Sequence, residues 1–174
     1  MLSPADSVEM HAMVNFMLEY HGPVYLRTGR SPVPTLFDSS YTYQLGYWPT
    51  MCSGNDVTIV AIGIMVHIAL QAAELLKNYG ISAQVINAST FKPVQVENFI
   101  ERVKNTRVVV TAEDHNIRGG LGSLVSELLC EYYPMPVLRI GLKDQFAESG
   151  EARKLFQKYG LTAENIVQTV LKAL

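Results

Sequence analysis

The chain has 174 residues, 48% hydrophobic and 17% charged, which is long and apolar enough to bury the core of one α/β domain. Its formal net charge is −2 and no run of Lys or Arg is present, which argues against a nucleic-acid-binding surface. The most apolar segment, residues 57–68, is shorter than a membrane span and is interrupted by Gly63 and His67. We therefore expect binding to neither nucleic acid nor membrane.

The first residues and the cysteines favour a cytoplasmic protein. The segment MLSPADSVEM has neither the basic nor the apolar region of a secretory signal. Cys52 and Cys130 lie far apart, with no CxxC pair and no histidine at the spacing of a metal ligand. Two isolated thiols suit a reducing compartment, so we expect neither a disulfide nor a metal site.

The first fifty residues predict one helix, one strand and a stiff loop. Asp6 is a candidate N-cap for a helix over residues 6–20, and Glu9 follows at the spacing of a capping box. A strand is predicted over residues 23–28, before the turn-rich loop GRSPVP. One helix and one strand are too small to fold alone, so we expect residues 1–40 to be the end of another domain and its linker, in a sequence that begins inside a longer protein. The apolar face of this helix comprises Met10, Met13, Val14, Met17 and Leu18.

From Asp56 onward, strands and helices alternate. Short β-branched runs predict strands over residues 57–62, 82–88, 107–112 and 136–140. Helices are predicted over residues 65–79, 94–104, 121–132, 152–159 and 163–174. This alternation predicts a three-layer α/β/α sandwich around a mostly parallel five-stranded sheet.

Several residues predict the ends and faces of these helices. Gly80 is a natural C-cap for the helix over residues 65–79, Pro93 favours the first turn of the helix over residues 94–104, and Thr162 is a candidate N-cap for the helix over residues 163–174. The helix over residues 65–79 has an expected apolar face, which comprises Ile68, Ala72, Leu75, Leu76 and Tyr79.

The segment AEDHNIRGGLGS, residues 112–123, lies between a predicted strand and a predicted helix, where α/β folds place ligands. Val125 stands where a dinucleotide fingerprint needs its third glycine, and the Gly-Lys-Ser/Thr of a P-loop is absent. The glycines favour a tight strand-to-helix turn, and an anion nest at the helix N-terminus is the alternative. The candidate residues for an anion or subunit contact are Glu113, His115, Gly119, Gly120 and Gly122.

Two arginines flank the dipeptide Thr28–Gly29 in the loop that follows the predicted strand over residues 23–28. Solvated surface arginines are one interpretation of Arg27 and Arg30. An anion clamp is the other, because guanidinium groups on a rigid loop suit bidentate phosphate binding. The local sequence leaves both interpretations open.

Motifs along the whole chain resemble, in order, the C-terminal third of transketolases: PADSVE, VYLRTGRSPVP, DVTIVAIG, NASTFKPVQ, AEDHNIRGGLG and GLKDQFAESG…YGLTAENI. The resemblance is closest to the split bacterial and archaeal type, whose C-terminal subunit is a separate chain. Deoxyxylulose-phosphate synthase and the β-subunits of 2-oxoacid dehydrogenases share the fold, but AESG favours transketolase because the synthase is expected to carry histidine before the glycine. Gln145 departs from the family's D-R-F motif, which has arginine at that position.

The resemblance implies a parent enzyme that uses thiamine diphosphate and Mg²⁺ to transfer a two-carbon ketol unit from a ketose phosphate to an aldose phosphate. The family's metal–diphosphate motif, GDG followed by asparagine, has no counterpart in this chain. The glutamate that activates the cofactor and the histidines of the donor site are expected upstream of Ser3. We therefore expect this chain to carry no catalytic residue and to bind no cofactor alone.

Residues 41–174 are expected, on the same resemblance, to form the transketolase C-terminal domain, which serves assembly. Arg30, in RSPVP, corresponds to the family's arginine that contacts the substrate phosphate. The implied partners are the remainder of the transketolase, sugar-phosphate substrates and further copies of the chain.

Two other functions stay open. The chain could be a free-standing regulatory or assembly module that binds an anion or a partner at the GGLG turn, although such a module needs no orphan amphipathic helix. It could also be the C-terminal domain of another thiamine enzyme, either deoxyxylulose-phosphate synthase or a 2-oxoacid dehydrogenase E1 β-subunit. The substrate separates transketolase from an enzyme of pyruvate-like acids, which need no second phosphate site.

Overall fold

The computed structural model describes residues 1–174 and is built around one five-stranded sheet with the order β1-β3-β2-β4-β5. Four of the strands run parallel, and β1 pairs with β3 antiparallel at one edge. The strands are β1 (Thr50–Cys52), β2 (Val57–Ala61), β3 (Ala83–Asn87), β4 (Val108–Asn116) and β5 (Val137–Leu142).

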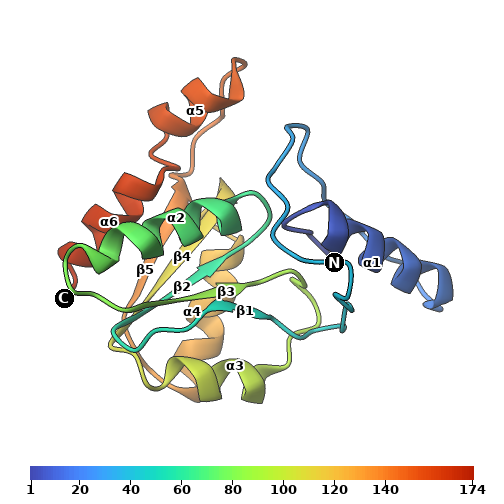
Figure 1. Ribbon diagram of the computed structural model, residues 1–174, viewed down its shortest axis with the longest axis horizontal. Helices are drawn as coiled ribbons and strands as arrows, with labels where there is room; N and C mark the ends of the chain where they lie inside the picture. Colours follow the sequence, from blue (N-terminus) through green and yellow to red (C-terminus); the bar gives the residue numbers. More distant parts are fainter.

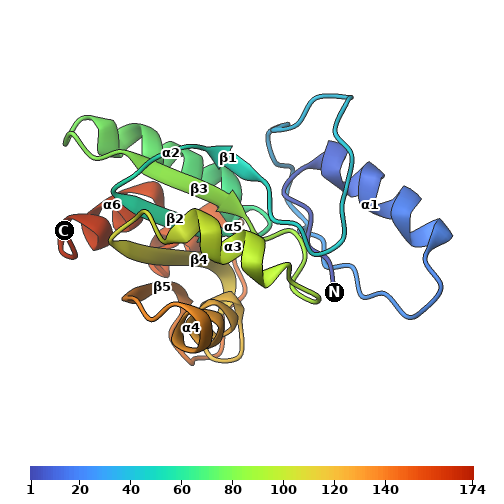
Figure 2. The ribbon, with the colours of Figure 1, turned by 90° about the horizontal axis from the view of Figure 1, so that it is seen from below.

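Helices cover both faces of the sheet, as Figures 1 and 2 show. On one face, α2 (Met65–Lys77) and α6 (Ala163–Leu171) bury a cluster of 21 residues against the strands. On the other face, α3 (Val96–Val103) and α4 (Leu121–Tyr132) bury a second cluster of 11 residues. Every residue of β2 and of β3 is buried, as expected for strands covered on both sides. The predicted three-layer α/β/α sandwich is confirmed.

Residues 1–45, which we call the N-terminal segment, lie beside the sheet and contain α1 (Ser7–Glu19) (Figure 1). Asp6 caps α1 as predicted, accepting a hydrogen bond from the Glu9 N–H at 2.8 Å. The predicted strand over residues 23–28 is wrong. Only Leu26 forms a bridge there, with Leu2, because the backbone of residues 25–27 finds just one short partner, in the first residues of the chain.

The apolar face predicted for α1 is only partly buried in this structure. Met13 is the one member that is fully buried, whereas Val14 is 38% and Leu18 81% exposed. Glu9 is buried instead. It lies on the side of α1 that meets residues 46–174, which we call the sheet domain. The helical periodicity was therefore right, but the side of α1 that contacts this chain is marked by an acid.

Several predicted boundaries also need correction. The short edge strand β1 was not predicted, and β4 continues through Asn116, so AEDHN, the first part of the predicted turn, is strand. Helix α3 begins at Val96 with Gln95 as its N-cap, so Pro93 lies before the helix. Leu75 and Tyr79 were expected on the buried face of α2 but are exposed. The residues of α2 that are buried are Met65, Val66, Ala69, Ala72, Ala73 and Leu76.

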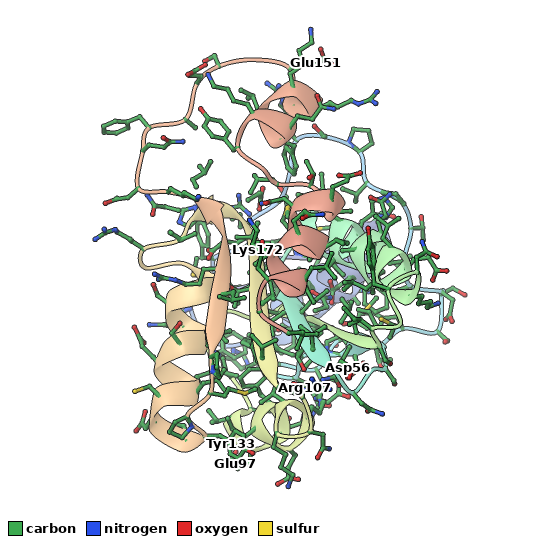
Figure 3. All side chains as sticks on the ribbon, turned by 90° about the vertical axis from the view of Figure 1, so that its left-hand side faces the viewer. Asp56, Glu97, Arg107, Tyr133, Glu151 and Lys172 are labelled. Atoms are coloured by element: carbon green, nitrogen blue, oxygen red, sulfur yellow. The ribbon has the colours of Figure 1, made fainter.

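Helix α5 (Ala152–Lys158) projects from the sheet at the end where the strands terminate (Figure 1). None of its residues is buried, and residues 143–151 before it are all exposed. Figure 3 shows Glu151 at this end of the molecule and Asp56 and Arg107 toward the opposite end. Asp56 and Arg107 lie just before β2 and β4, and Arg107 Nη2 is 3.6 Å from Asp56 Oδ1. The chain contains no helix of the length and hydropathy that crossing a membrane requires.

Candidate functional site

A cleft of about 560 Å³ lies where β2 and β4 end, between the sheet and the N-terminal segment. Gly63 and Ile64, just after β2, and Asp114 of β4 line its sheet side. The connection that follows β2 leads to β3 on one side, and the connection that follows β4 leads to β5 on the other, so the two loops diverge between β2 and β4. Open α/β sheets bind ligands at such a switch point, because the loops diverge there and leave a crevice. The topology therefore places a candidate site at this cleft.

Arg27 lies in the cleft and is bound to Asp114 through a two-pronged ion pair. Its Nη1 donates to Asp114 Oδ1 at 2.8 Å, and its Nη2 donates to Oδ2 at 3.0 Å and to the Asp114 carbonyl at 3.1 Å. The side chains are only 32% and 19% exposed, and the hydrogen bonds to Asp114 raise the pKa of Arg27. Arg27 is thus a permanent cation whose charge is already matched, and it is not a solvated surface arginine.

Arg30 lines the same cleft, three residues further along the loop. It is exposed, and it forms no ion pair and no side-chain hydrogen bond within the chain. A guanidinium with all of its donors free suits a phosphate, which can accept two parallel hydrogen bonds. The structure therefore places Arg30 where a phosphate entering the cleft could reach it.

Asp6 holds the far end of the loop that carries Arg30. Besides capping α1, its Oδ2 accepts hydrogen bonds from the backbone N–H groups of Leu36 at 2.6 Å and Phe37 at 2.9 Å. The carboxylate is 3% exposed and its oxygens are occupied by these donors. The N-cap pattern predicted the contact of Asp6 with the first turn of α1. No local sequence signal could have predicted its contacts with Leu36 and Phe37, about thirty positions away.

Glu9 is the second buried acid of α1, and its carboxylate gathers donors from three parts of the chain. It accepts from the Ala5 N–H at 2.7 Å and from the Tyr41 hydroxyl at 2.8 Å, and its Oε1 and Oε2 both accept from the Asn87 side-chain amide, at 3.0 and 2.9 Å. Burial raises the pKa of Glu9, and these hydrogen bonds oppose the rise. A capping box predicts a contact with the Asp6 N–H, but the contact is with Ala5, because Glu9 turns toward the end of β3.

The AEDHNIRGGLGS segment is organised around Glu113. Its carboxylate is 1% exposed and accepts the backbone N–H groups of Leu121 at 2.7 Å and Gly122 at 2.8 Å, which are the first donors of α4. The N-terminus of α4 therefore binds an anion, and that anion is a side chain of the same protein. Burial raises the pKa of Glu113, and the two backbone donors oppose the rise.

The remaining residues of this segment shape the turn. A Cβ at Gly120 would lie 1.9 Å from Glu113 Oε2, so no other residue leaves room for the carboxylate. Gly122 packs against Arg139, and Gly119 has a φ of +73°, as the turn requires. His115 is exposed and forms no side-chain hydrogen bond. Gln145, where the family motif has arginine, lies in the exposed loop before α5.

A magnesium site needs a cluster of free carboxylate or amide oxygens. No three side chains of His, Cys, Asp or Glu gather at one point in this chain. In the cleft, Asp6 is bound to backbone donors and Asp114 to Arg27, so neither carboxylate is free to bind a magnesium ion.

Comparisons with known proteins agree with this fold. The family model "Transketolase, C-terminal domain" matches residues 46–166. A solved structure described as a split gene transketolase, inactive beta4 tetramer, superposes with a TM-score of 0.92 at 43% identity, covering 99% of this chain and 56% of that one. Both matches fall on the sheet domain, and the solved structure extends the likeness to the N-terminal segment.

Two relatives bear the names of different enzymes. The chain is 42% identical over 165 residues to the 6-deoxy-6-sulfo-D-fructose transketolase subunit SqwH of Clostridium sp. (strain MSTE9), covering 95% of this chain and 51% of that protein. It is 40% identical over 171 residues to the 1-deoxy-D-xylulose-5-phosphate synthase of Heliobacterium modesticaldum (strain ATCC 51547 / Ice1), covering 97% and 26%. The chain thus spans about half the length of the transketolase subunit and about a quarter of the synthase. It belongs to the transketolase C-terminal domain family of thiamine-diphosphate enzymes, whose members include subunits of split transketolases.

Proposed function

We propose that this chain is the C-terminal part of a transketolase that moves a two-carbon ketol unit between ketose and aldose phosphates. The observation that carries the proposal is Arg30, an unpaired arginine in the cleft at the switch point of the sheet. Phosphate is the group shared by the donor and the acceptor sugars, and a free guanidinium is the group that suits it. A relative named as an apulose-4-phosphate transketolase subunit supports this choice of substrate class.

In this proposal the chain supplies contact with the substrate phosphate and takes part in assembly. Catalytic residues, thiamine diphosphate and Mg²⁺ belong to the remainder of the enzyme in this proposal, as the resemblance to transketolases implies. The partners are that remainder, sugar phosphates and further copies of the chain, and the enzyme works in the cytoplasm. The beta4 tetramer of the split gene relative supports assembly between like chains.

The N-terminal segment has a separate origin in this proposal. Residues 1–40 are the end of a pyrimidine-binding domain and its linker, and residues 41–174 are the C-terminal domain. The family match beginning at residue 46 supports such a division, as does the position of α1 beside the sheet (Figure 2). The exposed apolar side chains of α1 would then contact the rest of the pyrimidine domain.

Steady-state kinetics of the complete enzyme with two kinds of substrate tests the proposal. Arg30→Ala should raise the KM for a phosphorylated donor about tenfold to hundredfold, because a charged hydrogen-bonded contact is worth about 1.5–3 kcal/mol. The loss with hydroxypyruvate, a donor without phosphate, should be much smaller. Arg153→Ala is the matched control, because Arg153 is an exposed arginine of α5 outside the cleft. Equal losses with both donors would show that Arg30 has a structural role.

A synthase is the second candidate function, because a 1-deoxy-D-xylulose-5-phosphate synthase is 40% identical to this chain. The same purified enzyme should be assayed for formation of 1-deoxy-D-xylulose 5-phosphate. Formation of this compound without ketol transfer would replace the transketolase proposal. The Arg30 prediction would then apply to the phosphorylated substrate of the synthase.

A further inference from the structure

The loop that carries Arg30 is fastened at both of its ends by charged side chains. At its start, Arg27 is held by Asp114 of β4 through the two-pronged ion pair, and its backbone N–H donates to the Leu2 carbonyl at 2.8 Å. At its end, the Asp6 carboxylate holds the N–H groups of Leu36 and Phe37. The eight residues between the two anchors, 28–35, include Arg30 and two prolines.

Gly63, just after β2, lies beside the anchor at Arg27. A Cβ there would be 4.0 Å from both Arg27 Nη1 and Asp114 Oδ1, and 3.3 Å from the hydroxyl of Ser3. The pair is thus fixed by its own hydrogen bonds, with the backbone of Gly63 beside it. A planar guanidinium fills this position, and an ammonium cannot make the same fork.

The pair also decides the charge of the cleft. The charged side chains that line it are Asp6, Arg27, Arg30 and Asp114. Asp6 is bound to backbone donors, and Asp114 is neutralised by Arg27, so Arg30 supplies the one charge without a partner. If Arg27 were lost, the Asp114 carboxylate would repel a phosphate and compete with it for Arg30.

We propose that Arg27 and Asp114 are positioning residues for the phosphate contact: together they fix the start of the Arg30 loop and cancel the negative charge of β4 in the cleft. Neither residue touches the substrate in this proposal. It rests on the proposed function and extends it, because it explains why one of two neighbouring arginines is unavailable for phosphate and what that arginine does.

Four variants of the complete enzyme separate the effect of charge from that of shape. Arg27→Gln exposes the Asp114 charge, Arg27→Lys keeps a cation but loses the fork, Asp114→Asn removes the acid, and Arg27→Gln with Asp114→Asn gives a neutral pair. Each is compared with the wild type for KM and kcat, using a phosphorylated sugar pair and the unphosphorylated pair hydroxypyruvate and glycolaldehyde. Thermal unfolding of each variant reports whether the fold is kept.

Arg27→Gln should raise the KM for the phosphorylated pair about tenfold more than that for the unphosphorylated pair, a usual coupling between neighbouring charged groups. The double variant should recover most of this loss, because the repelling charge is gone, and Arg27→Lys should lie between. A purely structural role predicts the reverse: equal losses with both pairs, and a double variant at least as impaired as Arg27→Gln. Either result would overturn the proposal. If Arg27→Gln does not fold, the double variant and Asp114→Asn are compared with Arg30→Ala instead. The deciding quantities are again the change in KM for the phosphorylated pair and the change in KM for the unphosphorylated pair.

A binding measurement keeps this inference distinct from the proposed function. If the wild-type enzyme transfers no ketol unit, inorganic phosphate is titrated into the folded chain and followed by NMR. Arg30→Ala should then abolish the phosphate response, and Arg27→Gln should weaken it about tenfold while the double variant restores it. Equal phosphate binding by wild type and Arg27→Gln would overturn the positioning role even though the transketolase proposal had already failed.

Discussion

The sheet domain and the N-terminal segment are stabilised by different forces. The sheet domain buries two large apolar clusters, one on each face of the strands. The N-terminal segment buries only three apolar side chains, those of Leu2, Ala5 and Met13. Its attachment depends instead on the buried carboxylates of Asp6 and Glu9 and on the Arg27–Asp114 pair.

The difference matters because the two forces fix position to different degrees. Apolar burial is roughly proportional to area and tolerates small shifts, whereas hydrogen bonds to a carboxylate require donors at set distances and angles. The sheet domain thus provides stability, and the N-terminal segment is held in one orientation. The cleft lies between the two, so the geometry of Arg30 depends on the polar contacts.

The largest effect is expected from removing a core side chain of the sheet domain. Leu76→Ala should lower the free energy of unfolding by about 2–5 kcal/mol, because Leu76 is fully buried in the cluster under α2. Urea unfolding followed by far-UV circular dichroism measures this. Leu75→Ala is the control, since the neighbouring Leu75 is 38% exposed. Similar costs for the two leucines would contradict the assignment of the buried face.

Glu9→Ala should release the N-terminal segment and leave the sheet domain folded. It removes the acceptor for two buried donors, on Ala5 and Asn87, and for the half-buried hydroxyl of Tyr41, at an expected cost of about 1–3 kcal/mol. Hydrogen exchange should quicken at residues 1–45 and stay slow in the central strands. Glu19→Ala, at the exposed end of the same helix, should change neither. Uniform acceleration over the whole chain would mean that the two parts unfold together.

Glu9 should also make the attachment dependent on pH. Its pKa is raised by burial above the ordinary value of 4.5, so the folded state holds a proton more tightly than the unfolded state. The resulting stability is fully present below pH 4.5 and is lost as the pH rises through the folded-state pKa. Relative to wild type, Glu9→Gln should therefore gain stability as the pH rises from 4.5 toward 7. Urea unfolding at several pH values measures the difference, and a constant difference would refute the raised pKa.

The smallest effect is expected at the outer face of α1. Leu18 is 81% exposed, so Leu18→Ser should change the stability of the isolated chain by less than about 0.5 kcal/mol. The same substitution should weaken association with the remainder of the enzyme, because burying a large apolar side chain contributes about 1.5–3 kcal/mol. Urea unfolding of the chain alone tests the first statement, and sedimentation of the chain with its partner tests the second. A marked loss of stability in the isolated chain would show that Leu18 packs within it.

The periodicity of the sequence predicted the sheet domain well, because apolar burial repeats along the chain. Helix α4 has the predicted bounds, and β2 is buried throughout, as its β-branched run indicated. The errors lie where pairing depends on distant residues. Thr50–Cys52 becomes a strand only because β3 offers a free edge, and residues 23–28 fail to become one because Leu2 is their one partner.

The candidate site was predictable in part. The resemblance to transketolases singled out Arg30, and the structure places this arginine in the cleft; its contact with phosphate stays a prediction. The ion pair of Arg27 with Asp114 could not be read from the sequence, because 87 positions separate the two residues. Likewise, nothing local distinguishes Glu113 from Asp114, although the first turns toward α4 and the second toward Arg27. Consecutive side chains of a strand point to opposite faces of the sheet. This alternation separates Glu113 from Asp114 once β4 is known to extend to Asn116.

The carboxylate of Glu113 determines whether dissolved anions can bind at the N-terminus of α4. It is covalently tethered beside the first N–H groups of α4 and already buried there. A tethered group acts at an effective concentration of roughly millimolar or above, which a dissolved anion must exceed to displace it. Free phosphate or sulfate at ordinary concentrations therefore competes poorly for the end of α4. The N-terminus of a helix commonly binds anions, but at α4 it is already occupied by Glu113. Changes in salt composition should therefore leave the GGLG turn unaltered.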